Sequence, residues 1–197
     1  MSHGPPPQPT GAADSAGEQV VLLDALGRPI GTAPKAAVHH RSTPLHLGFS
    51  CWLTDGNGRI LLSTRARMKR TWPGARTNAF CGHPAPGEDL FDAVRRRARQ
   101  ELGTTLRDLR VALPDFRYTA TMNDGTMENE VCPVYTATVD PTTLRPSLDE
   151  VARIEWTTLD DLVRDVEREP DRHSPWLLLQ LPHLVADPDF NDQITRA

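Results

Sequence analysis

The sequence predicts a single α+β domain built as an α/β/α sandwich, because strand-like and helix-like segments are mixed along the chain. A length of 197 residues suits one domain with a sizeable core. Short segments with alternating apolar residues, separated by turns rich in glycine and aspartate, are typical of strands. Longer segments with an apolar stripe between capping residues are typical of helices.

The N-terminal half is predicted to contain mostly strands. Residues 1–17 are rich in proline and small polar residues, so we expect a disordered tail before a single domain at 18–197. QVVLL, residues 19–23, predicts a strand that continues into a short hairpin. LHLGFSCWLT, residues 45–54, alternates in side-chain type and predicts a strand with two distinct faces. The turn DGNGR follows, and ILLSTRA is expected to run back as the next strand.

The C-terminal half is predicted to contain the helices. TNAFCGHPAPGED, residues 77–89, is expected to be a loop that leads into a helix at 88–102, with Gly103 as its C-cap. FRYTATMND and NEVCPVYTATV predict strands on either side of a turn at Asp124 and Gly125. RIEWTTLDDLVRDVERE predicts a strand and then a helix that begins at Thr158, and SPWLLLQLPHLV predicts a last helix.

Charge and composition limit the classes of function. The formal net charge of −4 gives no general attraction to nucleic acid or to a membrane surface, so an anionic ligand needs a local group of cations. No apolar run approaches the roughly 20 residues that span a bilayer, and the N-terminus lacks a signal-peptide pattern, so we expect a cytoplasmic protein. Three cysteines are an odd number, which favours free thiols.

Two charged residues of the predicted helix project toward its apolar side. The apolar stripe is formed by Leu90, Phe91, Val94, Ala98 and Leu102. Arg97 and Glu101 lie inside the same arc, where charges are seldom left without partners. Two interpretations are open: an internal ion pair, or a pocket in which Glu101 holds a cation and Arg97 an anion.

Three histidines and two glutamates suggest a metal site: His39, His46, His83, Glu128 and Glu130. Glu128 and Glu130 are two residues apart on a predicted strand, so both carboxylates point to one side. Such neighbours repel unless one is protonated or a cation lies between them. Imidazole and carboxylate ligands together suit a divalent metal. Each residue alone is unremarkable, so the metal interpretation depends on their convergence.

Basic residues and a cysteine complete the candidates. Lys35, Arg65, Lys69 and Arg97 are either solvated surface or the binding group for a phosphate or diphosphate. Cys81 precedes a glycine and a histidine in the predicted loop, and is either an ordinary loop residue or a reactive thiol. Cys51 and Cys132 lie among apolar residues and are expected to pack in the core.

Several of these segments together resemble the type I isopentenyl-diphosphate isomerases, a family with the Nudix fold. The resemblance covers residues 19–184 and is carried by LHLGFSCWL, RTWPGARTNAFCGHP, PDFRYTATMNDGTMENEVCPVY and SPWLLLQ. CGHP together with ENEVCPV is a specific combination. The resemblance implies a Nudix-like mixed β-sheet flanked by helices.

The general Nudix signature is kept only in part. The positions that keep its frame are Gly82, Glu88, Arg96, Ala98, Glu101 and Gly103. Arg97 and Gln100 stand where the signature has glutamates. Hydrolysis by this fold relies on those carboxylates to gather Mg²⁺ ions, so their loss argues against a hydrolase. Arg76 stands where the isomerases commonly have a tryptophan, which leaves the pocket shape open.

The resemblance implies a role for each candidate residue. The metal ligands would be His39, His46, His83, Glu128 and Glu130, with Mn²⁺, Zn²⁺ or Mg²⁺ as the ion; the register of KAAVHH favours His39 over His40. Cys81 would be the catalytic thiol, with Glu130 and Tyr118 across the substrate. Glu101 would bind a Mg²⁺ ion that bridges to the substrate diphosphate. The diphosphate would be held by Lys35, Arg65, Lys69 and Arg97, and Trp176 would cover the hydrocarbon end.

The implied reaction is the interconversion of isopentenyl and dimethylallyl diphosphate through a tertiary carbocation, in isoprenoid biosynthesis. The alternatives are a Nudix-type diphosphate hydrolase and a catalytically silent metal-binding domain. We expect a small-molecule substrate, no nucleic-acid or membrane partner, and a monomer, although the sequence does not fix the oligomeric state.

Overall fold

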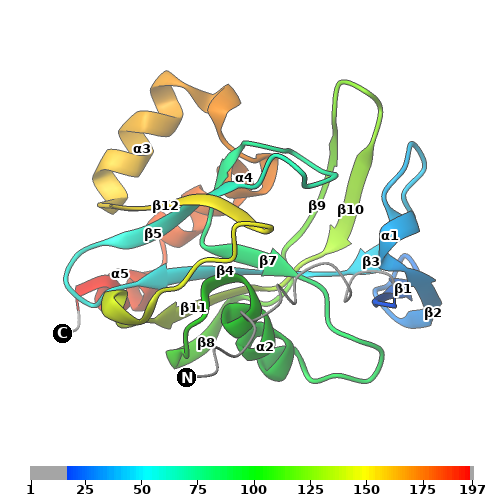
Figure 1. The fold of residues 1–197 in the computed structure, drawn as a ribbon, viewed down its shortest axis with the longest axis horizontal. Helices are drawn as coiled ribbons and strands as arrows, with labels where there is room; N and C mark the ends of the chain where they lie inside the picture. Colours follow the sequence, from blue (N-terminus) through cyan, green and yellow to red (C-terminus); the bar gives the residue numbers. More distant parts are fainter. Residues whose placement is uncertain (1–16, 196–197) are drawn as a thin grey trace, which may run out of the picture.

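The computed structural model describes residues 17–195 and confirms the sandwich (Figure 1). The strands are β1 (Gln19–Leu23), β2 (Pro29–Pro34), β3 (His46–Leu47), β4 (Phe49–Thr54), β5 (Ile60–Arg65), β6 (Arg76–Thr77), β7 (Phe80–Gly82), β8 (Arg107–Leu113), β9 (Arg117–Thr121), β10 (Met127–Val131), β11 (Val134–Thr138) and β12 (Val151–Thr157). The helices are α1 (Lys35–Val38), α2 (Leu90–Leu102), α3 (Leu159–Arg168), α4 (Pro175–Val185) and α5 (Pro188–Thr195). The predicted tail lies outside the described residues, apart from Gly17, and stays a prediction.

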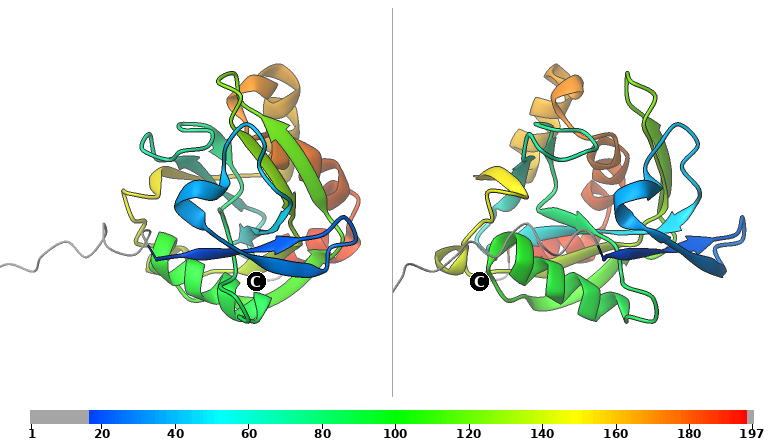
Figure 2. Two further views of the ribbon diagram at one scale, coloured as in Figure 1. Left: turned by 90° about the vertical axis from the view of Figure 1, so that its right-hand side faces the viewer. Right: turned by 45° about the vertical axis from the view of Figure 1, so that its right-hand side comes forward.

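The strands form two sheets that meet near the middle of the molecule. The smaller sheet has the order β2-β1-β3-β10-β9, and the larger has the order β12-β5-β4-β11-β8, with β6 beside β5 and β7 beside β4. Helix α2 covers one face of the larger sheet, and α3, α4 and α5 lie on the other (Figures 1 and 2). The layers are therefore helix, sheet and helix, as predicted.

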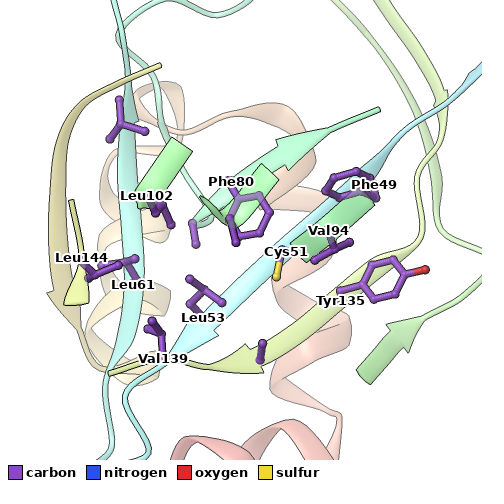
Figure 3. Packing of buried hydrophobic residues seen from close by; sticks show 14 of the residues in the cluster. Phe49, Cys51, Leu53, Leu61, Phe80, Val94, Leu102, Tyr135, Val139 and Leu144 are labelled. Atoms are coloured by element: carbon purple, nitrogen blue, oxygen red, sulfur yellow. The ribbon is translucent and has the colours of Figure 1, made fainter. Parts of the chain in front are cut away.

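Strand β4 has apolar residues on both faces, so the larger sheet is buried on both sides. Cys51 and Leu53 pack with Val94 of α2 in one core cluster (Figure 3). Trp52, on the opposite face, packs with Leu177 of α4 in the other. The expected packing of Cys51 in the core is confirmed.

Two predicted strands are each split where the chain passes from one sheet to the other. The segment 45–54 is broken at Gly48, and the segment 129–139 is broken at Cys132 and Pro133. The breaks are adjacent, because the Gly48 N–H donates to the Val131 carbonyl at 2.9 Å and the Ser50 N–H donates to the Pro133 carbonyl at 3.1 Å. Side-chain alternation continues through both breaks, so the pattern alone could not reveal them.

The placement of Cys81 in an irregular loop is wrong. Cys81 lies in β7, which pairs antiparallel with β4 so that Cys81 faces Ser50 in the register. A three-residue strand beside a glycine has no detectable periodicity, and it exists here because β4 supplies a partner. Strand β8 and helices α1 and α5 were also not predicted.

The ends of α2 follow the capping rules. The Asp89 side chain accepts from the backbone N–H groups of Phe91 and Asp92, and Gly103 adopts a left-handed conformation with φ of 62°. A methyl group at Gly103 would also lie 2.8 Å from the Arg145 carbonyl oxygen. The predicted C-cap is confirmed, and α2 begins two residues later than expected, within the usual uncertainty of helix ends.

Replacing Gly103 with alanine should therefore destabilise the fold by two effects, a left-handed alanine and a backbone clash. We expect a loss of about 2 kcal/mol or more in the free energy of unfolding by urea. Gly27→Ala is the matched control, because Gly27 has φ of 79° but nothing within 4 Å of the added carbon. It should lose only about 1 kcal/mol. Equal losses would show that the Arg145 contact relaxes freely.

Candidate active site

A cavity of about 620 Å³ opens where the two sheets meet. Its walls include most of the predicted site residues: Lys35, His39, Arg65, Lys69, Cys81, His83, Arg97, Tyr118, Glu128, Glu130 and Trp176. The two remaining candidates, His46 and Glu101, are buried outside the lining. Residues far apart in the sequence thus converge on one cavity, with Cys81 and Glu130 both among its walls.

The predicted convergence of histidines and glutamates is present. One ligand atom from each of His39, His46, His83 and Glu130 lies within 4.8 Å of the others. Glu128 adjoins this group, with its Oε2 2.9 Å from His39 Nε2. Glu130 pairs with His46 of β3 on one side and with Tyr118 of β9 on the other, so sheet register fixes all three side by side.

The unpaired nitrogen atoms of this cluster suit a metal ion. His46 Nδ1 lies 2.9 Å from the Pro44 carbonyl oxygen, which can only accept, so Nδ1 carries the proton and Nε2 presents a lone pair to the cluster. His46 Nε2 is buried and lacks a hydrogen-bond partner, and His39 Nε2 and Glu128 Oε2 are buried and close together but do not form a hydrogen bond. Buried polar atoms without partners are costly, and a shared divalent cation would satisfy them.

A glycine makes room for the Glu130 carboxylate. A methyl group at Gly48 would lie 2.3 Å from Glu130 Oε2 and 2.7 Å from its Cδ. The backbone between β3 and β4 therefore passes directly under the carboxylate. Only glycine at this position leaves the carboxylate where the histidines reach it.

His83 is held by Arg96 and Glu88, two positions of the Nudix frame to which the sequence analysis gave no role at the site. Arg96 donates to the His83 carbonyl at 3.2 Å and forms a two-pronged pair with Glu88. The imidazole Nε2 lies 3.0 Å from Glu130 Oε1. Burial lowers the pKa of His83 to about 4, so its ring is neutral and can act as a ligand at neutral pH.

The Cys81 thiol has two polar neighbours. Its Sγ lies 3.3 Å from Ser50 Oγ and 3.4 Å from Asn78 Oδ1. The Asn78 amide orientation is fixed, because its Nδ2 donates to the carbonyls of Cys51 and Phe80, so Oδ1 faces the sulfur as an acceptor. Burial raises the pKa of Cys81 to about 11, and the group is therefore a protonated thiol at neutral pH.

Ser50 is itself oriented from the other side. Gln180 accepts from the Trp52 indole at 2.8 Å and donates through Nε2 to Ser50 Oγ at 2.9 Å. The Ser50 hydroxyl hydrogen is then free for one of two sulfurs, Cys81 or Cys132, the latter at 3.5 Å. Sequence reasoning missed these polar residues; the only signal was a serine among apolar residues in FSCWL and a glutamine in the apolar run of α4.

The apolar end of the cavity is aromatic. Tyr118, Trp176 and Cys132 form a small buried cluster, against which Trp72 and Cys81 pack. The Trp176 ring is 5.9 Å from the ring of Tyr118 and 5.5 Å from that of Trp72. The Arg65 guanidinium lies 5.2 Å from the Trp176 ring centre. Trp72 was not among the predicted residues.

Three of the four predicted cations of the cavity already have carboxylate partners. Lys35 pairs with Glu18 at 2.5 Å, and Lys69 pairs with Glu150. Burial opposes the ionisation of Glu150, but the positive charges of Lys69 and Arg97 outweigh it and lower its pKa to about 2. These residues form a balanced group of charges rather than a purely basic patch.

Arg97 and Glu101 form the internal ion pair that was one of the two interpretations. Arg97 Nε donates to Glu101 Oε1 at 3.0 Å, and its Nη2 also lies 3.2 Å from Glu150 Oε1. Arg97 nevertheless lines the cavity, whereas the Glu101 side chain is buried and does not line it. The two interpretations are therefore compatible at Arg97.

Comparison with known proteins agrees with this geometry. The family model of the NUDIX domain matches residues 44–179. The isopentenyl-diphosphate Delta-isomerase of Leifsonia xyli subsp. xyli is 58% identical over 171 residues, which cover 86% of this chain and 92% of the relative. That of Clavibacter sepedonicus is 55% identical over 170 residues, with coverage of 86% and 89%. The chain belongs to the isopentenyl-diphosphate Delta-isomerase family, with a NUDIX domain.

The fold comparison is consistent with membership of the isopentenyl-diphosphate Delta-isomerase family. The crystal structure of DR0079 from Deinococcus radiodurans has a TM-score of 0.60 to this chain at 20% identity, and the match covers 77% of this chain and 90% of that one. At this identity the likeness concerns the fold alone. Among residues 17–195, no helix combines the length and the apolar character needed to cross a bilayer.

Arg76 stands where other members of the isomerase family commonly have a tryptophan, and it lies outside the cavity. Its guanidinium pairs with Glu155 of β12 and Asp165 of α3, and Nη1 lies 3.3 Å from His173 Nε2. Arg76 therefore forms an ionic link between β6, β12 and α3. The predicted catalytic residues are not in contact with it.

Proposed function

We propose that this chain interconverts isopentenyl and dimethylallyl diphosphate, as the names of its relatives indicate for them. The observation that carries the proposal is that a half-buried, protonated thiol and a carboxylate of the histidine cluster line the same cavity. The cavity also has an aromatic end and a group of cations, which suit a short hydrocarbon joined to a diphosphate.

The chemistry explains why such a site is needed. An unactivated alkene is a weak base, and its protonation gives a tertiary carbocation that water would capture. The site must exclude water and stabilise positive charge. The Trp176 ring supports this role, since a desolvated cation over an indole gains about 2 kcal/mol.

In this proposal the two proton-transfer groups act on opposite faces of the bound alkene. The Cys81 thiol exchanges a proton with one carbon, and the Glu130 carboxylate, with Tyr118 beside it, exchanges a proton with another. The Ser50 hydroxyl is close enough to donate to Cys81 Sγ when the sulfur is a thiolate. A divalent ion held by His39, His46, His83, Glu128 and Glu130 would fix the Glu130 carboxylate and set its proton affinity.

The diphosphate would bind at the group of cations. Lys35, Arg65, Lys69 and Arg97 all line the cavity and present donors that suit phosphate oxygens. A Mg²⁺ ion at Glu101 would bridge to the diphosphate, which requires the Arg97 side chain to share or release that carboxylate.

Glu101→Gln tests this bridging role. We expect the KM for the diphosphate at low Mg²⁺ concentration to rise by about tenfold, because the neutral amide loses the charge that holds the cation. The midpoint of unfolding should change only slightly, because Arg97 keeps Glu150 as a partner. Glu18→Gln is the matched control, since Glu18 pairs with Lys35 only. A KM of Glu101→Gln that equals those of the wild type and of Glu18→Gln at low Mg²⁺ concentration would refute the bridging role.

The decisive experiment follows isotope exchange from deuterated water into isopentenyl diphosphate. The proposal predicts deuterium in both isopentenyl and dimethylallyl diphosphate and no release of phosphate. Released phosphate or an isopentenyl monophosphate would instead identify a hydrolase. Metal binding without exchange or release would identify a silent metal-binding domain, and metal analysis of the purified protein would name the ion.

A further inference from the structure

A second cavity, of about 1150 Å³, lies directly beyond the aromatic end of the first. Its walls combine apolar side chains, Trp72, Met122, Pro175 and Leu178, with charged ones that include Arg153, Glu155 and Asp171. Trp176, Tyr118 and Cys81 line the first cavity and not the second, whereas Trp72 lines the second and not the first. Because Trp72 packs against the cluster that contains Trp176 and Tyr118, its indole is a partition between the two spaces.

The partition is held in place by its backbone. Trp72 has φ of 42°, a left-handed conformation that is strained for a bulky residue and persists only where the surroundings enforce it. Its N–H donates to Met122 Sδ at 3.4 Å, and its carbonyl accepts from Ala75. Arg65 clamps the preceding residue by donating to the Thr71 carbonyl at 3.0 Å. The indole is thus fixed from both sides.

The two segments that contact Trp72 project from the same side of the molecule. The loop 66–75, drawn in teal, and the β9–β10 hairpin project on the same side (Figures 1 and 2). The hairpin contributes Met122, whose carbonyl accepts from Gly125 in the turn. The second cavity lies between the loop, the start of this turn and the beginning of α4.

We infer that Trp72 limits the hydrocarbon part of the ligand to five carbons, and that removal of its indole joins the cavities and admits longer prenyl diphosphates. This inference rests on the proposed function. All prenyl diphosphates carry the same head group, so the cations cannot tell a five-carbon chain from a ten-carbon chain. Discrimination must come from a wall at the apolar end, and Trp72 is the side chain beyond Trp176 that separates it from a larger space.

The test measures binding by calorimetry, with the protein in its metal-loaded form and Mg²⁺ present. The probes are dimethylallyl diphosphate and its ten-carbon homologue geranyl diphosphate. In the wild type the ten-carbon probe should bind at least about tenfold more weakly than the five-carbon probe. Trp72→Ala should reduce this ratio by about tenfold or more, because the additional methylene groups gain contact with the apolar side chains of Met122, Pro175 and Leu178.

Two further variants serve as controls. Trp72→Phe keeps a ring in the partition and should retain most of the wild-type discrimination. Trp156→Ala removes a tryptophan that lines neither cavity, and the ratio should stay at the wild-type value. If Trp72→Ala does not fold, Trp72→Leu replaces it, and a smaller loss of discrimination in the same direction is expected.

Each outcome decides one claim. Equal binding of both probes by the wild type, or an unchanged ratio in folded Trp72→Ala or Trp72→Leu, would overturn the role of Trp72. A wild type that binds the probes in the expected ratio but incorporates no deuterium would contradict the proposed function and leave the partition intact. The two failures are therefore distinguishable.

Discussion

Cys81→Ala is expected to lower the rate of isomerisation by about a thousandfold, whereas Cys132→Ala retains most of the activity. A positioned acid contributes about 10² to 10⁴ to a proton-transfer rate, and an alkene offers no other group to protonate. Both sulfurs approach the Ser50 hydroxyl, at 3.3 and 3.5 Å. Cys81 lines the cavity and Cys132 does not. Comparison of the two variants therefore tests whether the effect of losing the thiol depends on its access to the substrate.

The measurements for this pair are turnover, deuterium incorporation and the unfolding midpoint. Both variants delete a sulfur that is buried or nearly so, and a moderate loss of stability is expected in each. If both variants keep their activity, or if both lose it to the same extent, the role of Cys81 is contradicted. Loss of activity only in Cys132→Ala would transfer the role to the other thiol.

Gly48→Ala is expected to abolish tight metal binding and to lower turnover by about a hundredfold, while the fold survives. The added methyl group would lie 2.3 Å from Glu130 Oε2, and the end of a flexible side chain moves more easily than a backbone. The carboxylate would therefore swing away from the histidines. Loss of a ligand or of its support commonly costs about 10- to 100-fold in metal affinity or activity.

A double variant shows whether the effect passes through Glu130. In a Glu130→Ala background the obstructed carboxylate is gone, so Gly48→Ala should add almost nothing to the loss of metal binding. Metal content and the circular dichroism spectrum are the readouts. Independent, additive losses would mean that the methyl group perturbs the strands instead, and that Gly48 has no special relation to the carboxylate.

The sequence was sufficient for the strand-rich sandwich, the ends of α2 and the group of histidines and glutamates. It was insufficient at the junction of the sheets, because alternation looks the same whether a strand continues or passes to another sheet at Gly48. It also missed β7, whose three residues are ordered by pairing with β4. Local patterns report local preference, and these features depend on distant partners.

The candidate site shows the same division. Residues with distinctive chemistry, such as Cys81 and His83, stand out in the sequence. Asn78 and Gln180 do not, because an amide becomes informative only when its donors and acceptors are known. Trp72 was missed for a different reason, since a tryptophan in a loop predicts burial but not which two spaces it separates.

The pairing of three of the four predicted cavity cations with carboxylates has a consequence for the ligand. Lys35 faces Glu18, and Lys69 and Arg97 share Glu150, so an anion arriving alone would meet nearly as much repulsion as attraction. An anion that arrives with a bound metal ion can instead pair its negative groups with the cations of the cavity and its metal ion with the carboxylates. Under the proposed function such a site would favour the magnesium complex of the diphosphate over the bare anion, and removal of free Mg²⁺ from the medium should weaken ligand binding.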